Sequence, residues 1–538
     1  MRNISVAVKS RISVLALAAA LHVCVAGSAL ASQLIADAAS RGDLDDIVSL
    51  IAAGEDVNFA QPDGTTALIW AAYQGDVEML TALLGAGADP DAANEFGVTA
   101  LMQAASHGDA PIISALIDAD VNLAITSETG TTPLMAAARA GSVESVELLL
   151  EHGADPNAVE SLQHQTALMW AVAEKHLDVT GALLEAGADP NMRARETTLD
   201  KRSPRTDFPS GGFTALMWAA READEPMTQL LLDGGADINI MNADGASPLM
   251  IAVVNDRFDY AAKLLELGAD ADDGSLYQAV LMRDATHDWF AKDGTQMRAD
   301  HPNELTALDL TRVLLEAGAD PNKLYFGQLH STSMCCDTKE NGTPFFRAAI
   351  AGDIEAMKLL IEYGADIEWR PAQQEGEVVG GFFGNRNIGK TALMVAMNGG
   401  RGVGMSGGPG DVRDGAPAPF REISNREPVD AMRLLLEAGA DVDAVTPEDG
   451  ESALHMAARD GLSEIVALLA EYGATLDIET AEGETALDIV EAQEPRVQGD
   501  TAGALVDRRV RAQPAEIAAQ LRELMGMSAA QASLQEAQ

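Results

Sequence analysis

The feature that most constrains this chain is a short phrase that recurs along most of its length. The phrase Gly-x-Thr-Ala/Pro-Leu occurs at Gly64–Leu68 and again at Gly97–Leu101, and Gly-Ala-Asp alternates with it, first at Gly87–Asp89. Uninterrupted copies are 33 or 34 residues apart. Such a period is typical of solenoids, in which each unit packs only against its neighbours. Further copies of the first phrase begin at Gly130, Gln165, Gly212, Gly245, Asn341, Gly389, Gly450 and Gly483, and further copies of the second end at Asp155, Asp189, Asp237, Asp270, Asp320, Asp366 and Asp441.

Each unit has the sequence marks of two short helices. The Thr of the first phrase stands where a hydroxyl caps the free N–H groups of a helix, and Pro133, Pro248 and Pro344 follow such caps as first-turn prolines. The first helix should end near a glycine such as Gly75, Gly141 or Gly352. The second has apolar residues at helical spacing, for example Val77, Leu80, Leu83 and Leu84. The glycine that closes each unit, such as Gly187, fits a left-handed C-terminal cap.

These phrases resemble the ankyrin-repeat family, whose pattern is G-x-T-P-L-H-x-A-A followed by Leu-Leu-x-x-Gly-Ala-Asp. The resemblance covers about Leu34 to Asp488 and implies an all-α solenoid of about eleven or twelve helix-turn-helix units with β-turn tips. One departure is systematic. The family's histidine is kept only at His455, and methionine replaces it elsewhere, at Met102, Met135, Met169, Met217, Met250 and Met394.

The repeats divide the chain into six segments. Residues 1–31 form a signal peptide, 32–63 an N-terminal capping unit, and 64–284 ankyrin repeats. Residues 285–424 form repeats with long insertions, 425–488 the last repeats, and 489–538 a C-terminal cap and tail. A helix is expected from Pro514, with a frayed tail over Ser528–Gln538. Residues 117–122 lack the Gly-Ala pair, so their helix should end irregularly. The insertions are expected at about 197–210, 285–305, 323–340, 370–387 and 399–424.

The first residues have the pattern of an export signal. Arg2, Lys9 and Arg11 precede an apolar stretch over Ile12–Ala26, and Ala29-Leu30-Ala31 is a small-x-small cleavage site. We therefore expect cleavage after Ala31 and a periplasmic or secreted bacterial protein, without membrane insertion after cleavage. A lipid on Cys24 is disfavoured because bulky Val23 precedes it.

The net charge disfavours nucleic acid as a partner. The chain has 36 Lys and Arg against 83 Asp and Glu, a net charge of -47. Without Arg2, Lys9 and Arg11 the mature chain has 33 against 83, or -50. Binding to nucleic acid depends on Lys and Arg that displace counterions from the phosphates. A chain this acidic should avoid phosphate backbones and anionic lipid.

Two short motifs match catalytic patterns, but the repeat explains the first and loop composition explains the second. Gly384–Thr391 matches the phosphate-binding pattern G-x-x-x-x-G-K-[ST], yet Gly389, Lys390 and Thr391 are in register with the other repeat openings. Gly404–Gly408 matches the nucleophile elbow around Ser406, but it lies in a glycine-rich insertion without the strand that this motif requires. We therefore predict a non-enzymatic protein without a cofactor, and a nucleotide hydrolase ranks below the alternatives.

Three other features have both a structural and a functional interpretation. Cys335 and Cys336 can form a vicinal disulfide, remain free or bridge two chains. With His330 and Met334 they can also form a soft site for Cu(I); the sequence favours an inert or disulfide-bonded loop. Asp270–Gly274 has too few spaced oxygens for an EF-hand and is interpreted as a solvated acidic turn. The tryptophans that share one repeat slot are interpreted as packing between repeats rather than as a ligand cage: Trp70, Trp170 and Trp218.

The resemblance also implies where a partner would bind. In the ankyrin family, residues beside the repeat glycine and residues just after the Ala-Ala pair line a concave groove that binds proteins. We therefore predict a protein-binding scaffold whose partner the sequence does not identify; the alternative is a copper-type metal-handling protein using His330, Met334, Cys335 and Cys336. The positions in this chain are Phe96, Val98 and Phe213 beside the glycine, and Tyr73, Gln74, Ser106, His107, Arg139, Arg221, Glu222, Arg459 and Asp460 after the Ala-Ala pair.

Overall fold

The computed structural model describes residues 35–198, 209–284, 303–327, 340–372, 387–397, 427–494 and 511–535. The predicted insertion at 399–424 and the motif around Ser406 lie outside these ranges, as do His330, Met334, Cys335 and Cys336. The chain divides into two compact units, unit 1 up to Ala243 and unit 2 from Asp244. Each unit is described by itself.

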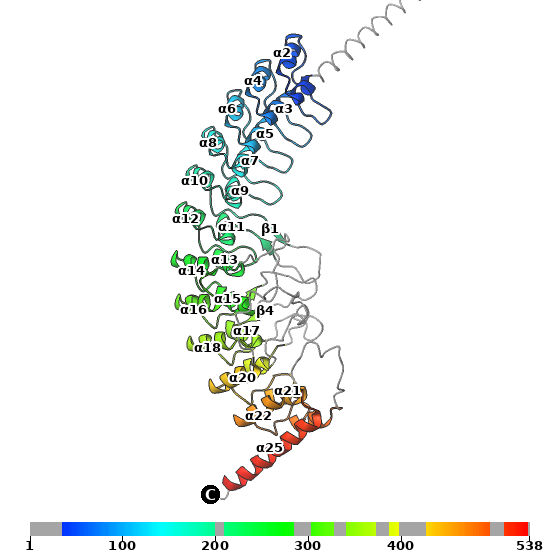
Figure 1. The fold of residues 1–538 in the computed structure, drawn as a ribbon, viewed down its shortest axis with the longest axis vertical. Coiled ribbons are helices and arrows are strands. Elements are labelled where there is room, and N and C mark those ends of the chain that lie inside the picture. The colour runs from blue at the N-terminus through cyan, green and yellow to red at the C-terminus, as the bar shows by residue number, and fades with distance from the viewer. Residues whose placement is uncertain are drawn as a thin grey trace, which may run out of the picture. The chain divides into compact units, whose positions relative to one another are not determined.

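Unit 1 consists of helix pairs in which an inner helix is followed by an outer helix. Inner helices contact the next inner helix along the chain, and outer helices contact the next outer helix, so the helices form two layers (Figure 1). A helix over residues 35–41 and α2 (Leu44–Ala52) form the first pair. The inner helices are α3 (Ala67–Gln74), α5 (Ala100–His107), α7 (Pro133–Ala140), α9 (Ala167–Ala173) and α11 (Ala215–Glu222), and the outer helices are α4 (Val77–Gly85), α6 (Ala110–Ile117), α8 (Val143–Glu151), α10 (Leu177–Glu185) and α12 (Glu225–Asp233).

Unit 2 continues the same alternation. Its inner helices are α13 (Pro248–Val254), α15 (Ser275–Asp284), α17 (Pro344–Ala351), α19 (Ala392–Ala396), α21 (Ala453–Asp460) and α23 (Ala486–Glu491). Its outer helices are α14 (Phe258–Glu266), α16 (Ala307–Glu316), α18 (Ile354–Glu362), α20 (Pro428–Glu437) and α22 (Ser463–Glu471). The long helix α25 (Pro514–Gln535) packs on α21, α22 and α23. The described residues thus contain eleven inner–outer pairs up to α22, with α23 and α25 after them, which confirms the all-α repeat solenoid.

The predicted caps are present. Thr66 Oγ1 accepts a hydrogen bond from the backbone N–H of Ile69 at 3.3 Å, and the equivalent Thr or Ser does so at α5, α7, α9, α11, α13, α17, α19 and α21. Such a cap typically contributes about 1 kcal/mol to the stability of a helix. Gly75 ends α3 with a φ of +70°, a left-handed conformation that other residues adopt only under strain.

Asparagine side chains join successive repeats, a link that the sequence analysis missed. The Nδ2 of Asn157 donates to the carbonyl oxygen of Gly187 at 3.1 Å, and its Oδ1 accepts from the N–H of Asp189 at 2.7 Å. Each such side chain therefore satisfies one donor and one acceptor of the following unit's closing turn. The same pair of bonds is made by Asn58, Asn191 and Asn322.

Two insertions contain short antiparallel strand pairs that the sequence did not predict. In unit 1, β1 (Glu196–Thr198) pairs with β2 (Pro209–Gly211). In unit 2, β3 (Tyr325–Gly327) pairs with β4 (Glu340–Gly342). Each pair joins the two ends of an insertion, so the insertion leaves the repeat and returns to it at one place. The sequence gives no signal because the strands are three residues long and lack an alternating apolar pattern.

The structure corrects the prediction for the C-terminal tail and resolves an irregular turn. The tail was expected to fray from Ser528, but α25 continues to Gln535. After α6, Asp120 takes the left-handed conformation with a φ of +59°, in the place where other repeats have glycine. Aspartate tolerates this conformation better than most residues because its short side chain can hydrogen-bond locally.

The core follows the repeat pattern. The Leu and Met of the first helix are buried at Leu134 and Met135, as are Met79, Leu80 and Leu83 of the second helix in their repeat. Val77, the first of the apolar residues at helical spacing in that helix, is 37% exposed. Among the described residues, every helix is too short or too polar to cross a lipid bilayer.

Candidate protein-binding face

The residues that follow the Ala-Ala pair form a line along the ends of the inner helices of unit 1. We define the inner-end positions as the seventh and eighth residues after the capping residue of each inner helix. Nine of the ten inner-end positions of α3 to α11 are exposed, and Arg221 is half-buried. The ten are Tyr73, Gln74, Ser106, His107, Arg139, Ala140, Ala173, Glu174, Arg221 and Glu222.

Aromatic rings connect the first of these positions. The ring of Tyr73 lies edge-on to Trp70, with centroids 5.7 Å apart, and edge-on to His107 in the next repeat at 5.5 Å. The indole N–H of Trp70 donates to Gln61 Oε1 at 2.9 Å. Tyr73 is nevertheless 53% exposed. The rings therefore pack between repeats, as predicted for Trp70, and also leave an aromatic surface accessible.

Arginine and tryptophan alternate over the following repeats. The guanidinium of Arg139 lies 5.5 Å above the ring of Trp170 and makes an ion pair with Glu174 at 3.6 Å. The guanidinium of Arg221 lies 5.4 Å from the ring of Trp218. Stacking on a ring orients a guanidinium and leaves its N–H groups available to a second partner. The arrangement is thus suited to holding carboxylate or carbonyl oxygens.

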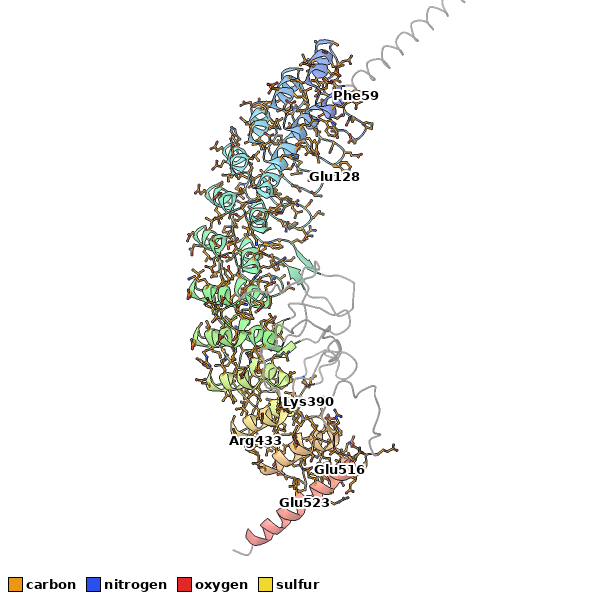
Figure 2. All side chains as sticks on the ribbon, viewed as in Figure 1. Phe59, Glu128, Lys390, Arg433, Glu516 and Glu523 are labelled. Atoms are coloured by element: carbon orange, nitrogen blue, oxygen red, sulfur yellow. The ribbon has the colours of Figure 1, made fainter. Side chains whose placement is uncertain are left out.

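The second predicted set lies in the loops before the inner helices, which project away from the outer helices in unit 1 (Figure 1). Phe96 is 58% exposed, and its N–H donates to Asn94 Oδ1 at 3.0 Å, so the turn that presents the ring is fixed. The adjacent loop includes Glu128 (Figure 2), whose N–H donates to the Phe96 carbonyl at 3.3 Å. Val98 is half-buried.

Phe213 is half-buried in its loop, and its ring centroid lies 5.4 Å from that of Trp218. The carbonyl oxygen of Phe213 accepts a hydrogen bond from the N–H of Ala194 at 2.9 Å. This bond joins the chain just before β1 to the chain just after β2. Phe213 packs beside Trp218. In the other two repeats a glutamine accepts a hydrogen bond from the indole N–H, Gln61 from Trp70 and Gln165 from Trp170. The indole N–H of Trp218 is buried and has no hydrogen-bond partner among the described residues.

Arg459 and Asp460 occupy the same positions in unit 2 but are less accessible. Both are half-buried, and Arg459 makes an ion pair with Glu451. The side-chain amide of Gln493 donates to the Arg459 carbonyl at 3.2 Å. Most of the predicted residues in unit 1 are thus exposed, whereas Arg459 and Asp460 in unit 2 are half-buried.

The described part of the phosphate-binding lookalike is a repeat opening. Gly389 has a φ of +72° and donates its N–H to the Pro371 carbonyl at 2.8 Å, and Thr391 Oγ1 caps α19 by accepting from the N–H of Met394 at 3.3 Å. Lys390 (Figure 2) stands between them in the turn. The glycine and the threonine therefore have the same structural roles as in the other repeats.

The copper-type site cannot be placed, because all four of its predicted residues lie outside the described ranges. Within those ranges, no cluster of three or more His, Cys, Asp or Glu side chains is arranged to hold a metal ion.

The prediction of a solvated acidic turn at Asp270–Gly274 is wrong for Asp273. This side chain is 8% exposed; its carboxylate accepts from the Ser247 hydroxyl and, at 2.7 Å, from the N–H of Ser275. Burial raises the pKa of Asp273, and the bonds from Ser247 and Ser275 oppose that rise. The carboxylate therefore anchors the start of α15 to the cap of α13 rather than facing solvent.

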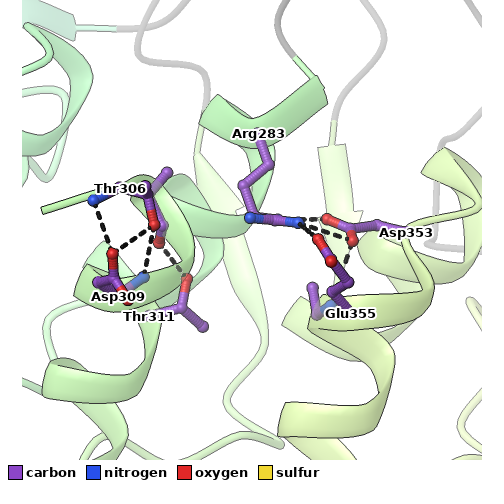
Figure 3. A network of polar contacts seen from close by, with 8 residues as sticks. Arg283, Thr306, Asp309, Thr311, Asp353 and Glu355 are labelled. Atoms are coloured by element: carbon purple, nitrogen blue, oxygen red, sulfur yellow. Dashed lines mark hydrogen bonds and ion pairs between the residues drawn. The ribbon is translucent and has the colours of Figure 1, made fainter. Parts of the chain in front are cut away.

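A second buried charge, absent from the sequence predictions, lies in unit 2 (Figure 3). Arg283, at the end of α15, donates to Asp353, the capping residue of α18, and its Nη2 also lies 3.0 Å from Glu355 Oε2. The Arg283 and Asp353 side chains are each 1% exposed. Thr306 and Asp309 make a separate capping box at α16. The Arg283 cluster fills the inner end of α15, so this part of unit 2 is a packed structure and not an open surface.

The comparisons with known proteins agree with this architecture. A family model described as ankyrin repeats in three copies matches residues 35–126, 123–194, 199–274 and 422–496, and a single-repeat model matches 340–369. The human "Ankyrin repeat and SOCS box protein 16" is 30% identical over 261 residues, which are 45% of this chain and 46% of that protein. The chain thus spans about half the length of this curated relative. Since the family models match more than half of its residues, the chain belongs to the ankyrin-repeat family.

Proposed function

We propose that this protein is a non-enzymatic scaffold that binds a protein partner through the inner-end positions and loop tips of its repeats. Ankyrin repeats are generally protein–protein interaction modules. The observation that carries the proposal is the row of ten inner-end positions from Tyr73 to Glu222. Nine of them are exposed, and they include the accessible side chains of Tyr73, His107 and Arg139. Tyrosine, tryptophan and arginine are the residues that most often dominate binding energy at protein interfaces.

The helices do not require these side chains. The buried Leu, Met and Ala residues form the core, and the caps and asparagine links hold the turns. Tyr73 and Phe96 are more than half exposed, although exposure of large aromatic residues to water is unfavourable without a partner. A partner that covers them gains apolar contact area without disturbing the fold.

The test is capture of the partner by the full-length protein from an extract of the native cell envelope. Changing Tyr73, Phe96 and Arg139 together to Ala should abolish capture and leave helicity and melting unchanged. A control with Val77, Leu177 and Arg433 changed to Ala removes two exposed apolar side chains and one arginine from outer helices. The control should capture the partner normally. Capture that survives the triple change but is lost on deleting residues 399–424 would assign recognition to that insertion instead.

We also propose that the protein acts in the periplasm or outside the cell. The support is the signal pattern of residues 1–31, with its basic start, apolar stretch and Ala29-Leu30-Ala31 cleavage site. N-terminal sequencing of the native protein should find Ser32. Finding Met1, or a lipid on Cys24, would contradict export by cleavage at this site.

A further inference from the structure

The inner-end positions differ between the two units in a way that limits where a partner can bind. In unit 1 nine of ten are exposed. In unit 2 the corresponding residues of α13, Val254 and Asn255, are buried, as are Leu281 and Met282 near the end of α15. Ile350 of α17 is half-buried and Ala351 is buried, and both positions of α21 are half-buried. The positions that follow α19 lie outside the described ranges. Among the described positions of unit 2, only one at α23 is exposed, the small side chain of Ala492.

Contacts inside unit 2 account for part of this closure. Tyr325 of β3 stacks on Tyr277 of α15, with ring centroids 4.9 Å apart. Near the end of the same helix, the guanidinium of Arg283 donates hydrogen bonds to Asp353 and Glu355. At α21, the N–H of Ala512, just before α25, donates to the carbonyl of Gly461 at 3.0 Å. At α15 and α21, residues of unit 2 thus cover helix ends whose counterparts in unit 1 are accessible.

The Lys and Arg side chains of unit 1 are unevenly distributed between its two helix layers. The outer helices α4, α6, α8, α10 and α12 contain eight carboxylates and no Lys or Arg. Within the described residues of unit 1, Lys and Arg beyond Arg41 occur only at the ends of inner helices or in the loops before them. They are Arg139, Lys175, Arg193, Arg195 and Arg221. The inner ends of α7 to α11 have Arg139, Lys175 and Arg221 against Glu174 and Glu222, so they favour an acidic partner more than the outer layer does.

The carboxylates already near these cations do not block such a partner. Glu174 lies 3.6 Å from Arg139, and Glu222 lies 3.0 Å from Lys175 and 3.8 Å from Arg221. The side chains of Arg139 and Glu174 are at least half exposed, as is that of Lys175. The Arg221 and Glu222 side chains are less exposed, at 26% and 39%. Exposed ion pairs such as Arg139–Glu174 contribute little to stability, so a carboxylate from a partner can replace them at small cost.

The tryptophans beside Arg139 and Arg221 provide apolar surface that the same partner would contact. Arg139 covers Trp170, and Arg221 together with Phe213 borders Trp218. An extended chain that presents carboxylates to the guanidinium groups can place apolar side chains on these rings.

We infer that recognition is confined to unit 1 and that its occupant is an acidic, extended polypeptide segment with apolar side chains, laid along the inner ends of α7, α9 and α11. This inference rests on the proposed function, because it names the partner chemistry for the same surface. Unit 2 contributes stability and its own closed surface, not contacts to this segment.

The test uses the full-length protein and a labelled short peptide in which Glu alternates with Leu, measured by fluorescence anisotropy. The peptide should bind, and its counterpart with Lys in place of Glu should not bind at the same site. Changing Arg139 and Arg221 together to Ala should weaken binding at least about tenfold. The matched control changes Arg312 and Arg433 to Ala; it removes the same charge from outer helices of unit 2 and should change affinity less than about twofold. Unchanged melting curves would show that both variants fold.

Three results would overturn the inference. These are no binding of the Glu-Leu peptide, equal weakening by the two double variants, and competition by dextran sulfate that matches the peptide at equal charge, which would indicate general attraction of polyanions. None of these results would contradict the proposed function if the Tyr73, Phe96 and Arg139 variant still loses its native partner. In that case the surface would bind a protein of different chemistry.

Discussion

The guanidinium of Arg283 lies against the carboxylate of Asp353, with Nη2 3.0 Å from Oδ1, although the two residues are 70 positions apart in the sequence. Both side chains are 1% exposed. Asp353 also caps α18 by accepting from the N–H of Ala356 at 3.1 Å. The pair therefore joins the end of α15 to the start of α18 across two predicted insertions.

Replacing Arg283 by Ala should destabilise the protein by about 3–5 kcal/mol, because it leaves the Asp353 carboxylate buried without its cation. Denaturant unfolding followed by circular dichroism measures the loss. Arg312→Ala is the control, since it removes an arginine that is 48% exposed and 3.9 Å from Glu362, and it should cost less than about 1 kcal/mol. Equal effects of the two substitutions would show that burial does not set the strength of the Arg283 pair.

Gly187 closes its repeat with a φ of +88°, and a Cβ added there would meet nothing within 4 Å. Gly187→Val should therefore destabilise through backbone strain alone, by about 1–2 kcal/mol. Gly181, within α10 of the same repeat, gives the opposite control. Its added Cβ would reach only Leu230 Cδ2 at 4.0 Å, so Gly181→Ala should stabilise the helix by about 0.5–1 kcal/mol. Chemical denaturation of both variants tests the cap, and a stable Gly187→Val protein would contradict it.

His455 is 1% exposed; its Nδ1 accepts from the N–H of Ser452 at 3.1 Å, and its Nε2 donates to the Ile478 carbonyl at 3.0 Å. Burial lowers the pKa of His455, although the bond to Ile478 acts in the opposite direction. Because the unfolded chain then binds a proton more readily than the folded one, this contribution to stability is complete above about pH 6.5 and is lost as the pH falls below it.

His455→Met installs the residue found at the same slot in other repeats, such as Met135. The stability of the wild-type protein relative to this variant should decrease as the pH is lowered from about 8 to about 5. Denaturation midpoints of the two proteins at each pH give this difference, in which the other titrating groups cancel. A difference that stays constant or grows toward low pH would show that the histidine is not held in its neutral form.

The sequence predicted the parts of the fold that depend on neighbouring residues. The threonine caps and the left-handed glycines follow from a few positions each, and the structure confirms them at Thr66 and Gly75. The candidate binding residues of unit 1 were predicted through the family resemblance. In the structure Tyr73 and Arg139 are exposed, and their role in binding stays a prediction.

The remaining features depend on contacts between residues distant in the sequence. Nothing near Arg283 indicates that it is buried, because its partner is 70 positions away. Asp273 looks like part of a charged turn until Ser247 of the preceding repeat is placed beside it. The accessibility of Arg459 was overestimated for the same reason, since Glu451 and Gln493 approach it only in the folded chain.

Hydrogen–deuterium exchange of the full-length protein, with and without the captured partner, tests whether the partner binds the inner ends of unit 1. We expect slower exchange on binding in peptides that contain residues 73–75, 106–108, 139–141, 173–176 and 221–223, with little change in α4, α8 and α12 or in unit 2. Slower exchange confined to the outer helices, to unit 2 or to residues 399–424 would contradict it.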